Sequence, residues 1–147
     1  MDERGMICIV GCLYWSSSRA KQKLEHWAEA DAAKAIAGTA RWLAERGDRH
    51  VIIDVDNEGM AARAKKWSTT NLMAAAKSAA FELLVAANNK APAEGEDLNI
   101  HHSPYEPGKP WFDSEASPAT PGGYWGKYSK ETHQKLSLIH ISEPTRQ

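Results

Sequence analysis

The sequence predicts an α/β fold that forms part of a (β/α)8 barrel, and three observations lead to this prediction. Apolar runs rich in β-branched residues alternate with helical stretches, which is typical of parallel sheets with crossover helices. Polar residues follow the predicted strands, at the edge where barrel enzymes carry their chemistry. The glycine-rich phosphate fingerprints of doubly wound sheets are missing, which favours the barrel.

The first predicted strand is the apolar run from Ile7 to Tyr14, which suits burial on both faces of a sheet. A helix is expected next, because apolar residues recur every three or four positions from Leu24 to Leu43. Gly47 is expected just after the end of this helix, where a residue often adopts the left-handed αL conformation and glycine is favoured. A second strand is therefore expected shortly afterwards, from Val51 to Val55.

The same alternation continues along the chain. A helix capped by Thr69 or Thr70 precedes a third predicted strand over residues 81–87. Two shorter strands are expected over residues 97–102 and 110–117. Because helices separate the first three strands, their connections are crossovers and the strands are expected to be parallel.

Polar residues gather at the carboxyl ends of these predicted strands. They are Trp15 to Ser18, Asp56 to Glu58, Asn88, Asn89, His101, His102 and Glu115. In a parallel barrel these ends meet at one rim, so the rim is the candidate site.

Composition limits the classes of protein and partner. A formal net charge of −1 gives no electrostatic footprint for nucleic acid or an acidic membrane. No apolar run approaches the roughly 20 residues that span a bilayer, and no signal peptide is visible at the start. Cys8 and Cys12, four positions apart on one strand, would lie about 13 Å from each other, too far for a disulfide. The sequence implies no cofactor and no obligate protein partner.

The tail is expected to be foreign to the protein. The residues LSLIHISEPTR (136–146) match the translation of a transposase adapter from short-read sequencing libraries, and Gln147 would come from neighbouring index bases. Such scars are excluded from fold reasoning. We therefore expect one partial-barrel domain over residues 1–135, which continues past about Lys135 and also before DERGM. A barrel without its remaining strands keeps two open sheet edges, so the chain alone is expected to be unstable or to aggregate.

Two glutamates end predicted strands, Glu58 after VIIDVDN and Glu115 after GKPWFDS. Hydrolysis of a glycosidic bond needs two carboxyl groups, one protonated to release the leaving oxygen and one ionised to attack the sugar or activate water. Spacing alone leaves open a solvated turn or an ion pair at either position.

The stretch VIIDVDNEG (Val51 to Gly59) resembles the fourth strand of clan A glycoside hydrolases, most closely family 5, the endoglucanase and mannanase family. In that clan an Asn directly precedes the acid/base Glu, as Asn57 precedes Glu58. GKPWFDSEAS (108–117) resembles the seventh strand, which ends with the nucleophile, here Glu115. GMICIVGCLYW and RWLAERGDRHVIIDVDNE resemble the third strand and the helix that leads into the fourth. The likeness covers roughly residues 5 to 117 and strands three to seven.

This resemblance implies a retaining glycoside hydrolase that cleaves β-glycosidic bonds of a polysaccharide or oligosaccharide by double displacement. Glu58 would be the acid/base, Glu115 the nucleophile, and Asn57 would bind the sugar 2-hydroxyl. Many relatives are secreted, and the sequence itself leaves the compartment open.

Further residues match the family more loosely. His102 and Tyr105 correspond to a His and a Tyr on its sixth strand, although the family spaces them two apart rather than three. The connection SPYEPGKP, before the seventh strand, is also shorter than the helix of the family. Candidate platforms for sugar rings are Trp15, Trp111, Tyr124 and Trp125, with core packing the stronger expectation for Trp111.

Other interpretations remain open at this stage. The chain can be a carbohydrate-binding or interaction domain with inert carboxylates, or a metal-dependent barrel hydrolase using His101 or His102 with Asp113. DVDNEG also imitates the start of a calcium loop, but the position that needs a bidentate glutamate holds Lys65. The sequence therefore predicts no calcium site, and the glycoside hydrolase interpretation needs no metal.

Overall fold

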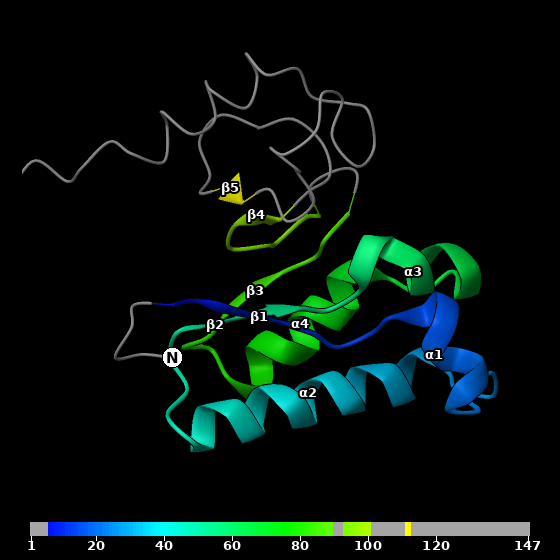
Figure 1. Ribbon diagram of the computed structural model, residues 1–147, viewed down its shortest axis with the longest axis horizontal. Coiled ribbons are helices and arrows are strands. Elements are labelled where there is room, and N and C mark those ends of the chain that lie inside the picture. The colour runs from blue at the N-terminus through cyan, green and yellow to red at the C-terminus, as the bar shows by residue number, and fades with distance from the viewer. Residues whose placement is uncertain (1–5, 90–92, 101–110, 113–147) are drawn as a thin grey trace, which may run out of the picture. The chain divides into compact units, whose positions relative to one another are not determined.

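The computed structural model describes residues 6–89, 93–100 and 111–112 (Figure 1). The chain divides into two units, Met1–Ser114 and Glu115–Gln147, and every described residue belongs to the first.

The centre of the first unit is a three-stranded parallel sheet. Its strands are β1 (Cys8–Gly11), β2 (Val51–Asp54) and β3 (Leu84–Ala86), and they lie side by side in the order of the sequence. The predicted parallel pairing is confirmed. The predicted strands were too long, because β1 ends before the loop at Cys12 and β3 has only three residues.

Helices connect the strands. Between β1 and β2 lie α1 (Trp15–Lys21) and α2 (Glu29–Glu45), where the sequence predicted one helix from Leu24. Between β2 and β3 lie a 3₁₀ turn, η2 (Asn57–Gly59), then α3 (Met60–Lys65) and α4 (Thr69–Ala79). A separate parallel pair is formed by β4 (Asn99–Ile100) and β5 (Trp111–Phe112), which are shorter than predicted.

The N-terminus of α4 shows a second correction. Its cap is Ser68, whose hydroxyl accepts a hydrogen bond from the Asn71 backbone N–H at 3.2 Å, rather than either threonine. The Glu29 carboxylate accepts from the Ser68 backbone N–H at 2.9 Å and from the Asn71 side chain at 2.7 Å. These bonds hold the starts of α2 and α4 together.

The main core lies between the sheet and the two long helices, which pack against each other in Figure 1. Side chains alternate along β2, so that Val51 and Ile53 face the helices while Ile52 and Asp54 face the other side of the sheet. On that other side Ile52 packs with Ala86, Leu98 and Ile100. Consecutive strand order with both long helices on one face suits an arc of a barrel, and the barrel itself stays a prediction.

Candidate functional site

The candidate site lies where the three parallel strands end, on the side of α1 and α3 in Figure 1. Three backbone hydrogen bonds hold together the ends of the strands and the loops that follow them. The Cys12 N–H donates to the Asp54 carbonyl at 2.8 Å, the Asn57 N–H donates to the Leu13 carbonyl at 3.0 Å, and the Val55 N–H donates to the Ala86 carbonyl at 3.1 Å. The polar residues after β2 and β3 therefore share one edge of the sheet, as the sequence predicted for a parallel sheet.

Asp54 is one of two buried carboxylates at this edge, with 2% of its surface exposed. Its Oδ1 accepts from the Asn88 backbone N–H at 2.9 Å and from the Asp56 backbone N–H at 3.3 Å. Burial raises the pKa of Asp54 to about 6, against the lowering effect of these two N–H donors. Among the residues that the structure describes, Asp54 makes no ion pair. The Asp54 carboxyl group therefore gains or loses its proton near pH 6.

Cys12 lies beside Asp54 and is a poor candidate for a nucleophile. Burial raises the pKa of its thiol to about 12, and the charge of Asp54 contributes to this rise. Because the thiolate is the reactive form, this side chain is an inert thiol at neutral pH.

Asp56 stabilises the start of α3. It is fully buried, and its two carboxylate oxygens accept from the backbone N–H groups of Ala61 and Ala62, each at 2.9 Å. Those N–H groups lie in the first turn of α3, where a helix lacks internal partners. Burial raises the pKa of Asp56, while the two N–H donors and the nearby charge of Arg63 lower it.

Asn57 and Glu58 form the turn between β2 and α3. The Asn57 side-chain Oδ1 accepts from the Asn88 side-chain amide at 3.2 Å. Glu58 is half-buried with φ 53° and ψ 15°, a left-handed conformation that costs a residue other than glycine about 1–3 kcal/mol. The Arg63 guanidinium donates to the Glu58 carbonyl and helps to hold this turn. Such strain is concentrated at functional sites, and here it falls on the predicted acid/base.

Gly59 follows Glu58 and also has a left-handed backbone conformation. Substitution of Gly59 tests how tightly this turn packs against Asn89. The φ of Gly59 is 61°, and a Cβ added there would lie 2.8 Å from the Asn89 side-chain nitrogen. Gly59→Ala is expected to lower the free energy of unfolding by about 1–2 kcal/mol, because both the backbone and the Asn89 amide must yield. Urea denaturation measures this change.

The control is Gly38, an exposed glycine inside α2 where an added Cβ would meet no atom within 4 Å. Gly38→Ala is therefore expected to raise stability by about 0.5–1 kcal/mol, because alanine favours the helix. Equal effects of the two substitutions would contradict the strained turn.

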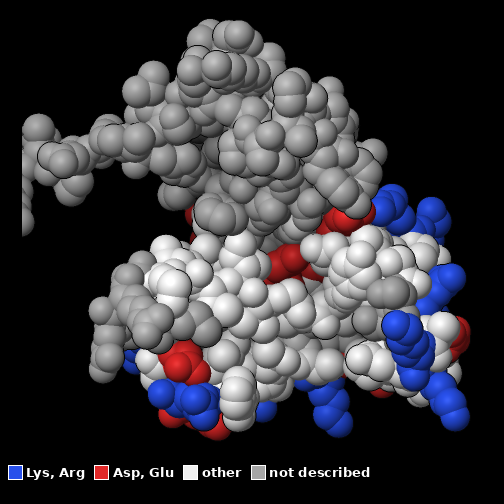
Figure 2. Space-filling model, viewed as in Figure 1, with Lys and Arg blue, Asp and Glu red and all other residues white. Residues whose placement is uncertain are grey.

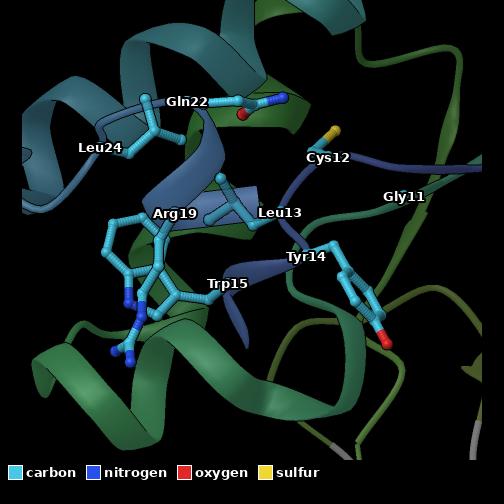
Figure 3. A pocket seen from close by; sticks show the side chains of 8 residues that line it. All are labelled: Gly11, Cys12, Leu13, Tyr14, Trp15, Arg19, Gln22 and Leu24. Atoms are coloured by element: carbon cyan, nitrogen blue, oxygen red, sulfur yellow. The ribbon is translucent and has the colours of Figure 1, made fainter. Parts of the chain in front are cut away.

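Trp15, predicted as a sugar platform, is 3% exposed and packs as a core residue. Its ring meets that of Trp67 edge to face at 4.8 Å, and Lys65 lies over both rings. Trp15 also lines a pocket of about 190 Å³ at the end of β1 (Figure 3). The other residues that line the pocket are Gly11, Cys12, Leu13, Tyr14, Arg19, Gln22 and Leu24.

The remaining predicted site residues, Glu115, His102, Tyr105 and Trp125, lie outside the described residues, as do His101, Asp113 and Tyr124. Trp111 begins β5. In the described ranges, no group of three or more His, Cys, Asp and Glu side chains is arranged to hold a metal ion. No helix in the same ranges is long and apolar enough to cross a membrane.

Basic side chains are frequent in and beside α1 and α3, near this end of the sheet. Figure 2 shows Lys and Arg side chains on the side where α1 and α3 lie. They belong to Arg19, Lys21, Lys23, Arg63, Lys65 and Lys66 in and beside those helices.

No protein-family model matches this sequence, and comparisons with curated proteins and with solved structures find no significant match.

Proposed function

We propose that this chain carries part of the active site of a retaining β-glycoside hydrolase, with Glu58 as acid/base and Glu115 as nucleophile. The observation that carries the proposal is the turn at Asn57 and Glu58. It follows a buried parallel strand, it has a strained backbone at Glu58, and it is bonded to the loops after both neighbouring strands. The resemblance of this turn and of the Glu115 segment to clan A glycoside hydrolases supplies the roles.

The chemistry needs the two carboxyl groups in succession. Glu115 attacks the anomeric carbon while Glu58 gives its proton to the departing glycosidic oxygen, and a glycosyl ester forms on Glu115. Glu58, now ionised, takes a proton from water, the water attacks the same carbon, and the sugar leaves with its original configuration. Each of the two displacements inverts the anomeric carbon, so the configuration of the sugar is retained overall.

Asn57 has the donor that a sugar hydroxyl requires. Its side-chain oxygen is engaged by Asn88, so the amide N–H groups are the part of the side chain left to meet a ligand. A hydrogen bond from this amide to the 2-hydroxyl that strengthens in the transition state would lower the barrier.

The test is to trap the ester. A retaining enzyme reacts with a dinitrophenyl 2-deoxy-2-fluoro-β-glycoside, and the resulting fluoroglycosyl ester on its nucleophile is hydrolysed only slowly. The gluco and manno forms of the reagent would be tried in parallel. In the full-length protein we expect stoichiometric labelling, and peptide mass spectrometry should locate the label on Glu115.

The matched control is Glu115→Gln, which should remain unlabelled. Turnover of the unsubstituted dinitrophenyl glycoside without any label on Glu115 would contradict the proposal. Carbohydrate binding without turnover, equal in the wild type and in Glu58→Gln, would instead favour a binding domain.

A further inference from the structure

We propose that Asp54 and Asn88 are positioning residues for Asn57: Asp54 fixes the backbone at Asn88, and the Asn88 side chain fixes the Asn57 amide. This Asp54–Asn88–Asn57 relay is a property of the fold and can be tested as such. Only its effect on turnover rests on the proposed function.

The relay is a continuous set of hydrogen bonds across two strands. The Asn88 backbone N–H donates to Asp54 Oδ1 at 2.9 Å, and the Asn88 side-chain Nδ2 donates to Asn57 Oδ1 at 3.2 Å. The Asp56 backbone N–H donates to the same oxygen of Asp54 at 3.3 Å, which holds the start of the turn from the other side. A change at Asp54 would therefore reach Asn57 through Asn88, and it would also act on the backbone at Asp56.

The sheet makes room for this carboxylate. In the strand register Asp54 lies between Gly11 of β1 and Ala86 of β3, two of the smallest residues. A Cβ on Gly11 would lie 4.0 Å from Asp54 Oδ2. Because a buried carboxylate is costly without partners, a role beyond filling the core is the better explanation of this arrangement.

Asn88 is equally buried, with 3% of its surface exposed. Its side-chain Oδ1 is buried and has no hydrogen-bond partner among the described residues. The amide is therefore oriented by its single bond to Asn57 and by its backbone bond to Asp54. This makes Asn88 the link that transmits a change at Asp54.

The relay should respond to pH through Asp54. An ionised carboxylate accepts hydrogen bonds about twice as strongly as a neutral group, so protonation below about pH 6 should loosen the Asn88 backbone. The groups that face Asp54 are the Cys12 thiol from the β1 loop, Asp56 on its own segment, and uncharged Asn88 after β3. Arg63 of α3 acts on Asp56. None of these is a cation paired with Asp54.

The experiment follows the asparagine signals by NMR in the full-length protein labelled with ¹⁵N-asparagine. We expect the Asn88 backbone amide and the Asn57 side-chain amide to shift together with an apparent midpoint near pH 6. Asp54→Asn should remove both shifts. The matched control Asp48→Asn, at a partly exposed residue that pairs with Arg46, should leave both unchanged.

A second variant separates the two steps. In Asn88→Ala the backbone N–H remains, so its titration should persist, whereas the Asn57 side-chain amide should no longer respond. Loss of one such hydrogen bond predicts a fall in kcat/KM of about 3- to 10-fold. Titration of the Asn57 amide that persists in Asp54→Asn, or that is missing from the wild type, would overturn the relay.

The outcomes also separate the two proposals. Coupled titration in a protein that hydrolyses no glycoside would support the relay and contradict the proposed function. Turnover that depends on Glu58, with no pH coupling between Asn88 and Asn57, would contradict the relay alone.

Discussion

Replacing Glu58 by alanine is expected to lower kcat/KM by about 10²- to 10⁴-fold on β-glycosides with a poor leaving group. The loss should be far smaller on a dinitrophenyl glycoside, because dinitrophenolate departs without a proton. A general acid acts only in the step that breaks the bond to a basic oxygen. Steady-state kinetics over a series of aryl glycosides, graded by the pKa of the leaving phenol, measures this dependence.

Removal of the Glu58 carboxylate should also open the second step to a small anion. Added azide is expected to attack the glycosyl ester without help from a base and to give a β-glycosyl azide, which restores turnover. The matched control is Glu45→Ala, at an exposed glutamate that ends α2, and it should behave as the wild type. An equal loss on all leaving groups, without azide rescue, would show that Glu58 is not the acid/base.

The second large effect concerns stability and arises from Asp54. Its folded pKa of about 6 exceeds the ordinary value of 3.8, so the native state holds the proton more tightly than the unfolded chain. The stability that this proton provides is complete below about pH 4 and is lost as the pH rises through about 6. The difference between the two pKa values corresponds to about 3 kcal/mol.

Asp54→Asn should remove this dependence while keeping an oxygen that accepts from Asn88 and Asp56. We expect the free energy of unfolding of the variant to exceed that of the wild type above pH 7, and the gain to shrink as the pH falls toward 4. Urea denaturation at pH 4, 5, 6, 7 and 8 measures the difference. Asp56 also has a raised pKa, so the difference between variant and wild type is compared, rather than either curve alone. A difference that does not change with pH would contradict a buried, unpaired Asp54.

Local patterns predicted the sheet well. The run VIID is apolar up to its last residue and formed β2 as expected, and the intervening helices made the sheet parallel. The helix α1 was missed because WSSSRAK has no apolar stripe. The later helix was predicted to start too early, because Leu24 and Trp27 continue its apolar spacing. They lie in the connection between α1 and α2, which includes Lys23 with φ 56°.

The contacts of the candidate site could be predicted only in part. That Asn57 and Glu58 would follow a strand was visible in the sequence, but the partners of Asp54 and Asn57 were not. Asn88 meets both only through the parallel pairing of β2 and β3, more than thirty positions along the chain. One signal was available: an aspartate inside an otherwise apolar, fully buried strand needs hydrogen-bond partners. For Trp15 no such signal was available, because the neighbouring sequence does not indicate a core residue that packs on Trp67.

The central claim is that Glu58 and Glu115 act on the same sugar, and the distance between their carboxyl groups tests it most directly. It would be measured in a crystal structure of the full-length protein with the fluoroglycosyl ester in place or with a bound oligosaccharide. A retaining enzyme requires a separation of about 5–5.5 Å with both groups in one cleft, and this is the predicted result. A separation of about 6.5–9.5 Å would indicate an inverting mechanism, and carboxyl groups on opposite sides of the sheet would contradict the two-glutamate account altogether.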